Sequence, residues 1–130
     1  MRKFVLLALF LLVGVLASVA QKAEVLYFKA ELACCQAKAC DAIEADVKAI
    51  IDNNFDDETV TFKEVKLAEA SNKELVEIHK AKSQTVVIIA KKKKKETIVD
   101  VSDIVRNYSR SRNKAVFETE LLAKINESIK

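Results

Sequence analysis

The chain has 130 residues, of which 51% are hydrophobic and 32% are charged, and its formal net charge is +3. This hydrophobic share excludes an intrinsically disordered chain, and one glycine with no proline excludes collagen-like and linker-rich proteins. The length predicts a single domain. Three cysteines are too few for a disulfide-dense scaffold, and an excess of +3 is too small to predict nucleic-acid binding.

The N-terminal segment has the order of a secretory signal peptide. Basic residues 2–3 precede an apolar run over residues 4–16, and small residues occupy positions 18–20. An uncleaved membrane anchor is the alternative, although the run is shorter than the ~20 residues of a spanning helix. We expect residues 1–20 to be a signal peptide. Residues 21–130 would then form an exported domain, periplasmic or secreted, with a net charge of +1, no glycine and no stable membrane insertion.

Hydrophobic periodicity predicts the elements of this domain. In chain order, we expect a buried strand at 25–28, an amphipathic helix at 41–54, a strand at 60–67, a short helix at 72–80, a central strand at 85–90, a half-exposed strand at 97–101, a helix beginning at 102 and a helix over 113–130. Asn72 is a candidate cap for the short helix, and Ser102 or Asp103 for the helix that follows the last strand.

The predicted order is β-α-β-α-β-β-α, which indicates an α/β fold. A strand, a helix and a second strand in succession predict a parallel pair with a right-handed crossover. The last two strands are separated by a few residues only, so they predict an antiparallel hairpin. We therefore expect a four-stranded mixed sheet with helices on both faces.

Three cysteines lie between the first predicted strand and the first predicted helix, at Cys34, Cys35 and Cys40. The positive end of a helix dipole stabilises a thiolate and lowers the pKa of a thiol. A thiolate attacks disulfides, and a second cysteine nearby can resolve the mixed disulfide. The cluster therefore favours redox chemistry. An inert structural disulfide in a binding protein, and a soft-metal site for copper(I), zinc or arsenic(III), are the alternatives.

The element order and the position of the cysteines resemble the thioredoxin fold, from Glu24 to Lys130. The chain also resembles a family of small exported thioredoxin-like proteins that carry the name nitrophenyl-compound nitroreductase subunit family. The shared features are Tyr27-Phe28 at a strand end, a cysteine followed by x-x-Ile-Glu at Cys40 to Glu44, and no proline before the third strand. The resemblance implies thiol–disulfide oxidoreductase activity toward a protein partner, without a cofactor.

Two departures from the thioredoxin pattern affect this expectation. Thioredoxins use Cys-x-x-Cys, but that spacing would place the first cysteine at Ala37. Counting forward from Phe28 favours Cys34 as the nucleophile, with Cys35 as the alternative and Cys40 as the resolving residue. Two cysteines five residues apart in one helix point ~140° apart, so a disulfide requires the first partner to lie in the loop before the helix. A vicinal Cys34–Cys35 disulfide is conformationally demanding.

The second departure is Gln84, which stands where thioredoxins have a cis-proline. A cis bond before a residue other than proline costs about 3 kcal/mol, so we expect a trans bond here.

Other polar residues near the cysteines have two interpretations each. Glu44 is a candidate base for the deprotonation of Cys40, or a solvated helix residue. Lys38 could stabilise a thiolate by its charge, or could be a solvated lysine. His79, the one histidine, has the spacing of an apolar helix face, which favours a partly buried side chain over a metal ligand.

The run of lysines from Lys91 to Lys95 is the largest cluster of like charge in the sequence. A basic cluster attracts anionic lipid or nucleic acid. The run also falls where the predicted hairpin turns, and lysines there would be solvated and would protect the sheet edge from pairing. We expect no nucleic-acid partner from the small net charge.

Overall fold

The structure is a computed structural model that describes residues 22–31, 34–92 and 95–130. For residues 34–37 it describes the backbone only. The predicted signal peptide lies outside the described residues. The elements are β1 (Ala23–Lys29), α2 (Cys34–Asn54), β2 (Val60–Lys66), the 3₁₀ helix η2 (Ala70–Asn72), α3 (Lys73–Ile78), β3 (Val86–Lys92), β4 (Lys95–Asp100), α4 (Ser102–Ser111) and α5 (Lys114–Ile129). Within the described ranges, no helix is both long and apolar enough to cross a bilayer.

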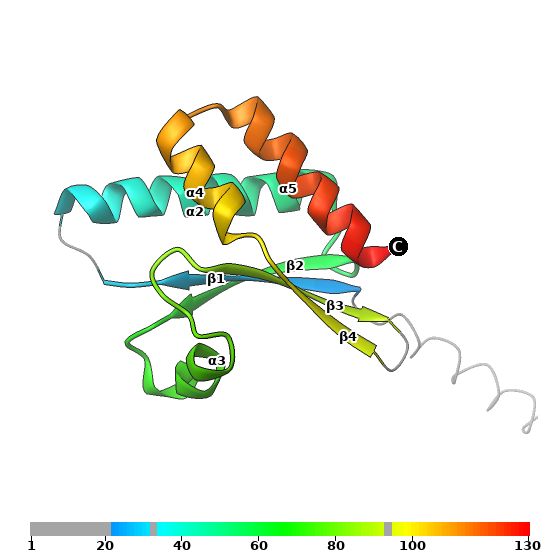
Figure 1. Cartoon of the computed structure of the whole chain (residues 1–130), viewed down its shortest axis with the longest axis horizontal. Helices are drawn as coiled ribbons and strands as arrows, with labels where there is room; N and C mark the ends of the chain where they lie inside the picture. Colours follow the sequence, from blue (N-terminus) through cyan, green and yellow to red (C-terminus); the bar gives the residue numbers. More distant parts are fainter. Residues whose placement is uncertain (1–21, 32–33, 93–94) are drawn as a thin grey trace, which may run out of the picture.

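The four strands form one mixed sheet in the order β2-β1-β3-β4 (Figure 1). Strands β1 and β2 are parallel, β1 and β3 are antiparallel, and β3 and β4 form an antiparallel hairpin. These pairings confirm the predicted parallel pair, hairpin and α/β class. Two helices follow the last strand, as the helix beginning at 102 and the helix over 113–130 predicted, although the summary order β-α-β-α-β-β-α counted them as one.

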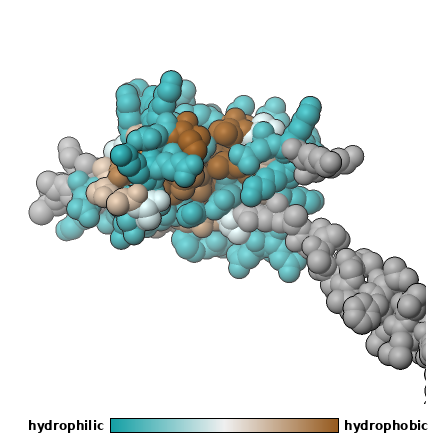
Figure 2. Space-filling view, turned by 90° about the horizontal axis from the view of Figure 1, so that it is seen from below, coloured by the Kyte–Doolittle hydropathy of each residue, from teal (hydrophilic) through white to brown (hydrophobic). Residues whose placement is uncertain are grey.

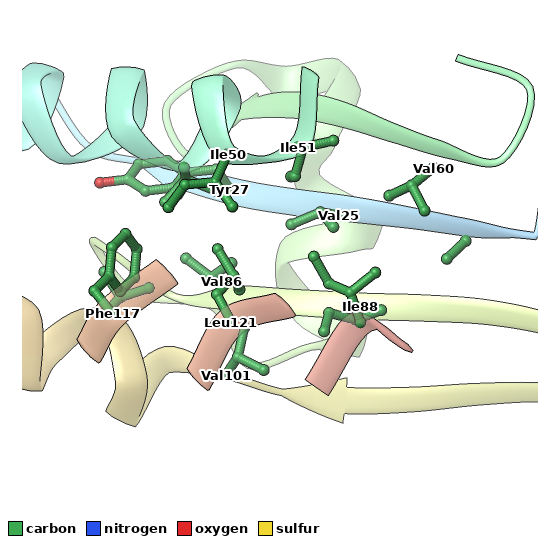
Figure 3. Close-up of a cluster of buried hydrophobic side chains, with 14 of the residues drawn as sticks. Val25, Tyr27, Ile50, Ile51, Val60, Val86, Ile88, Val101, Phe117 and Leu121 are labelled. Atoms are coloured by element: carbon green, nitrogen blue, oxygen red, sulfur yellow. The ribbon is translucent and has the colours of Figure 1, made fainter. Parts of the chain in front are cut away.

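The main hydrophobic core lies between one face of the sheet and helices α2, α4 and α5 (Figures 1 and 3). Alternate residues of β1 and β3 point into it because successive side chains of a strand face opposite sides. Tyr27, Phe117 and Leu121 are among its largest members, each at most 1% exposed. The Phe117 ring stacks on Tyr108 with 4.3 Å between ring centroids, which joins α5 to α4.

The opposite face of the sheet is covered by the short helix α3 (Figure 1). The buried cluster there is smaller, and Leu75 and Val76 pack against it from α3 while remaining half-buried. Ile78 on this helix is 60% exposed and Ile98 on β4 is 50% exposed. Figure 2 shows this side of the molecule as mainly hydrophilic, with hydrophobic surface in its middle and a paler patch toward its left end.

Helix α2 begins at Cys34, seven residues before the predicted start at Asp41. The segment Cys34–Cys40 contains no glycine or proline, and its alanines, glutamine and lysine are good helix formers. Nothing local therefore stops the helix from extending toward β1. The consequence is that the backbone of all three cysteines belongs to one helix.

The two predicted helix caps, Asn72 and Ser102, do not cap their helices with their side chains. Asn72 precedes α3, but its side-chain amide donates to the Lys66 carbonyl oxygen instead of capping. Ser102 is the first residue of α4, and its hydroxyl accepts a hydrogen bond from the N–H of Val86 at 3.0 Å. The carboxylate of Asp100 accepts from the Ser102 N–H instead, at 2.8 Å. The backbone positions of both helix starts are thus close to those expected, while the side chains tie the helices to other strands.

Candidate functional site

Cys40 lies in the second turn of α2, beside the carboxyl end of β1. It is a free cysteine, and the residue is only 7% exposed. The side-chain amide of Gln84 donates a hydrogen bond to its sulfur, with 3.2 Å between Nε2 and Sγ. The hydroxyl of Tyr27 donates to the Cys40 carbonyl oxygen at 3.4 Å. The thiol is therefore contacted by a residue from the loop before β3, while β1 holds the backbone of Cys40 through Tyr27.

Gln84 reaches the sulfur because of the tight turn that holds it. The N–H of Thr85 donates to the carbonyl of Lys82 at 3.0 Å, and Gln84 has a φ of 63°. The N–H of Gln84 donates to the carbonyl of Phe28, which fixes the turn against the end of β1. No peptide bond in the described ranges is cis, so the expected trans bond before Gln84 is confirmed.

An ionic cluster lies next to Cys40 and joins β1 to α2. The Lys29 ammonium group is 2.5 Å from the Asp41 carboxylate and 2.9 Å from the Glu44 carboxylate. Both hydrogen bonds, the one to Asp41 first, raise the pKa of Lys29. A lysine bound in this way stays charged throughout the physiological range.

Glu44 is not the solvated helix residue that was one of its two interpretations, since its side chain is 12% exposed. Burial is the main cause of a raised pKa at this carboxyl group, and a hydrogen bond with Glu64 on β2 raises it further. Lys29 acts in the opposite direction and lowers it. Glu44 is therefore a largely buried carboxyl group with a raised pKa, one helical turn from Cys40.

Tyr27 lies between Cys40 and the ionic cluster closely enough for both to act on its phenol. Burial raises the pKa of its phenol, and negative charge on Cys40 and Glu44 raises it further. The hydroxyl group therefore stays protonated and acts as a hydrogen-bond donor at the base of the site.

The sequence-predicted site residues are only partly brought together. Cys34 and Cys35 are in the first turn of α2, and their side chains lie outside the described residues. Lys38 is exposed. In a regular helix the Cα atoms of Cys35 and Cys40 are roughly 8–9 Å apart, and those of Cys34 and Cys40 about 10 Å, beyond the ~7 Å limit of a disulfide.

His79 lies away from the cysteines. Its ring packs against Phe28 on the α3 face of the sheet, with 5.8 Å between ring centroids, whereas Cys40 lies on the α2 face. The side chain is partly buried, as its spacing predicted. Across the part of the chain that the structure describes, no three His, Cys, Asp or Glu side chains are grouped to hold a metal ion, and the side chains of Cys34 and Cys35 are outside that part.

Sequence comparison adds no relative to this description. No protein-family model matches the chain, and no curated protein is significantly similar to it.

Three members of the site were not predicted as such. Lys29 and Glu64 are charged residues at strand ends, where nothing in the sequence separates a structural ion pair from a solvated charge. Tyr27 lies in an apolar run and reads as a core residue. The one available signal was alternation in β1, which places Tyr27 and Lys29 on the same face of the strand.

Proposed function

We propose that this protein is an exported, thioredoxin-like thiol–disulfide exchange protein whose chemistry is carried by Cys34, Cys35 and Cys40. The observation that supports the proposal is the environment of Cys40. A free thiol, covered by Gln84 and adjacent to the buried carboxyl group of Glu44, lies on the helix that follows the first strand of a β2-β1-β3-β4 sheet.

The exchange has two balanced steps. The thiolate of Cys34 or Cys35 attacks a disulfide of the partner protein, which forms a mixed disulfide and releases one partner thiolate. The thiolate of Cys40 then attacks the sulfur of Cys34 or Cys35, which releases the second partner thiolate. Two electrons pass from the protein to the partner, and the partner's thiolates take up protons. Glu44 is one turn from Cys40 and is the candidate acceptor for the thiol proton of Cys40.

The helix imposes a condition on the second step. Because the backbone of Cys34 and Cys35 is helical, neither can bond to Cys40 while the first turn of α2 is intact. Resolution therefore requires this turn to unwind. The first turn of a helix has no hydrogen-bond partners on its N–H groups, so it is the part that opens at least cost.

A trapping experiment tests the proposal. The Cys40→Ser variant retains the nucleophile and lacks the resolving thiol, so it should accumulate mixed disulfides with partner proteins on non-reducing gels. Serine keeps an acceptor for the Gln84 amide, so the variant should fold. The matched control is the Cys34→Ser, Cys35→Ser double variant, which should trap nothing. Wild-type protein should also reduce insulin.

Two results would contradict the redox proposal, and each would favour an alternative function. Absence of both trapping and insulin reduction would leave a binding protein, in which alkylation and mass spectrometry should find an inert pairing of cysteines. Retention of one copper(I) ion after desalting, lost in the double variant, would indicate soft-metal binding instead.

A further inference from the structure

The last pair of the β3–β4 hairpin carries like charges. Lys92 on β3 is directly opposite Lys95 on β4, next to the opposite-charge pair Lys91 and Glu96, and the two residues between Lys92 and Lys95 in the sequence are also lysines. Like charges in directly opposite positions destabilise a strand pair, and short hairpin connections favour Asn-Gly. A local rule broken in this way is expected where a residue serves function rather than folding.

Two further lysines, Lys22 and Lys91, lie at this end of the sheet. The N–H of Lys91 donates to the carbonyl of Lys22 at 2.8 Å, and Ala23 is paired with Ala90. We call Lys22, Lys91, Lys92 and Lys95 the lysine cluster. All four are exposed, and among the described residues none of their ammonium groups forms an ion pair with a carboxylate.

The cluster continues into an open pocket between the hairpin and the end of α5. The pocket has a volume of about 290 Å³ and is lined by Lys92, Thr97, Val99, Lys124, Glu127 and Ser128. Glu127 lies 3.8 Å from the Lys124 ammonium group and offsets its charge in part. Lys92 has no such partner among the described residues, so the net charge facing the pocket is positive.

The position of the cluster indicates what it faces. It extends from the start of β1 across β3 to β4, and Figure 1 shows the N-terminal end of β1 and the hairpin end of β3 at the same end of the sheet. In the sequence, the apolar run over residues 4–16 ends only six residues before Lys22. During export, before the expected removal of residues 1–20, that run would keep the lysine cluster close to the headgroups.

We propose that the lysine cluster docks the protein on a membrane surface that contains anionic phospholipids. Lysine ammonium groups bind phosphate headgroups as flexible point charges, and each one near an anionic surface strengthens binding roughly fivefold. The pocket beside Lys92 and Lys124 is large enough for one headgroup phosphate. The acidic residues at the same end, Asp56 to Glu58, precede β2, and the Lys22 N–H donates to the neighbouring Thr59 carbonyl, so the basic surface extends from Lys22 toward the hairpin and not toward β2.

Vesicle sedimentation tests the proposal with the protein as purified, its N-terminus determined by mass spectrometry. The probes are phosphatidylcholine vesicles with and without 30% phosphatidylglycerol. The test variant carries Lys91→Gln, Lys92→Gln and Lys95→Gln. A matched control carries Lys66→Gln, Lys73→Gln and Lys82→Gln, the same loss of charge away from the cluster, at the carboxyl end of β2, on α3 and in the loop before β3. We expect the test variant to bind phosphatidylglycerol vesicles about 100-fold more weakly than wild type, and the control to bind within severalfold of it.

Three results would overturn the proposal. One is binding that does not depend on phosphatidylglycerol, and another is an equal loss of binding in both variants, which would indicate net charge alone. The third is tighter, salt-sensitive binding to a single-stranded oligonucleotide than to vesicles, which would indicate a nucleic-acid surface. Mixed-disulfide trapping should be unchanged in the test variant, so failure here leaves the proposed redox function standing.

Discussion

Three residues in the described ranges have a left-handed backbone although none is glycine: Lys80, Gln84 and Arg112, with φ values of 48°, 63° and 58°. Lys80 follows α3, where its N–H and that of Ala81 donate to the carbonyls of Glu77 and Val76 and close the helix. Each side chain in this conformation costs roughly 1–2 kcal/mol relative to glycine. Because residues 21–130 contain no glycine, these turns carry a conformational strain that glycine would relieve.

Replacing Arg112 by glycine should stabilise the protein. Arg112 ends α4, is exposed, and donates its N–H to the carbonyl of Tyr108, a bond that glycine retains. Relief of the left-handed strain outweighs the added entropy of the unfolded chain, so we expect a net gain of about 0.5–1 kcal/mol. Urea denaturation measures it. Arg110→Gly, inside the same helix, should lose about 1 kcal/mol. A loss from Arg112→Gly as large as that from Arg110→Gly would contradict this explanation.

Helix α2 is held to the sheet by charged residues as well as by its apolar face. Lys29 of β1 binds Asp41 and Glu44 of α2, and Glu44 in turn shares a hydrogen bond with Glu64 of β2. Further along the helix, Asp46 accepts a hydrogen bond from the hydroxyl of Tyr108 at 2.7 Å. These contacts set the position of Cys40 relative to both strands.

The raised pKa of Glu44 predicts how stability changes with pH. In the pH range above the ordinary value of 4.5 and below the raised pKa, the folded protein binds the Glu44 proton more tightly than the unfolded chain does. Stability should therefore fall as pH rises through this range, by at most about 1.4 kcal/mol per pH unit. Glu44→Gln should remove this pH dependence. At pH values above the raised pKa, the variant should be more stable than wild type.

Urea denaturation between pH 4.5 and pH 8 measures the effect as a difference between variant and wild type, which cancels the other titrating groups. Glu120→Gln, at an exposed position of α5, is the control and should track the wild type. If Glu44→Gln and wild type show parallel pH profiles, the carboxyl group is ionised equally in both states and the prediction fails.

Oxidation should open the first turn of α2. A Cys35–Cys40 disulfide cannot form across a regular helix, so its formation must unwind the backbone around residues 34–38. In the Cys34→Ser variant, hydrogen exchange at the amides of residues 38–40 should become faster after oxidation, while exchange in the rest of α2 stays slow. Oxidation without faster exchange, with a mass that shows an intramolecular disulfide, would contradict the helical position of Cys35.

The sequence predicts the sheet better than it predicts the site. The apolar β-branched run at 85–90 predicted a central strand, which β3 confirms, and Ile43 and Val47 on one helix face correctly placed the body of α2. The start of α2 was missed because helix-forming residues without a stop signal leave the boundary open. The contact between Gln84 and Cys40 joins residues 44 apart in the sequence. It also depends on the positive φ of Gln84, which the residue type does not predict.

At the scale of the whole molecule, the two polar features lie at opposite ends of the sheet. The thiol site is at the carboxyl end of β1, near Lys29, and the lysine cluster is at its amino end, near Lys22. The seven residues of β1 separate them by roughly 20 Å. A protein docked through the lysine cluster would therefore present Cys40 and its neighbours away from the membrane, where a soluble partner can reach them.

The two faces of the sheet should contribute unequally to stability, and the same substitution on each face measures this. Leu121 is fully buried in the main core, whereas Leu75 on α3 is half-buried against the smaller cluster. We expect Leu121→Ala to lower the free energy of unfolding by about 3–5 kcal/mol and Leu75→Ala by about 1–2 kcal/mol. Because a domain of this size is stable by only about 5–15 kcal/mol, the first loss is severe and the second is tolerable.

Urea denaturation gives both free energies, and native-state hydrogen exchange identifies what unfolds. In Leu75→Ala, amides of α3 should exchange faster while those of β1 and β3 keep their protection, because α3 opens locally without the main core. In Leu121→Ala, protection should fall across the sheet. Equal losses from the two substitutions, with α3 and β1 exchanging together, would mean that α3 belongs to the same cooperative unit as the main core and that the faces are not separable.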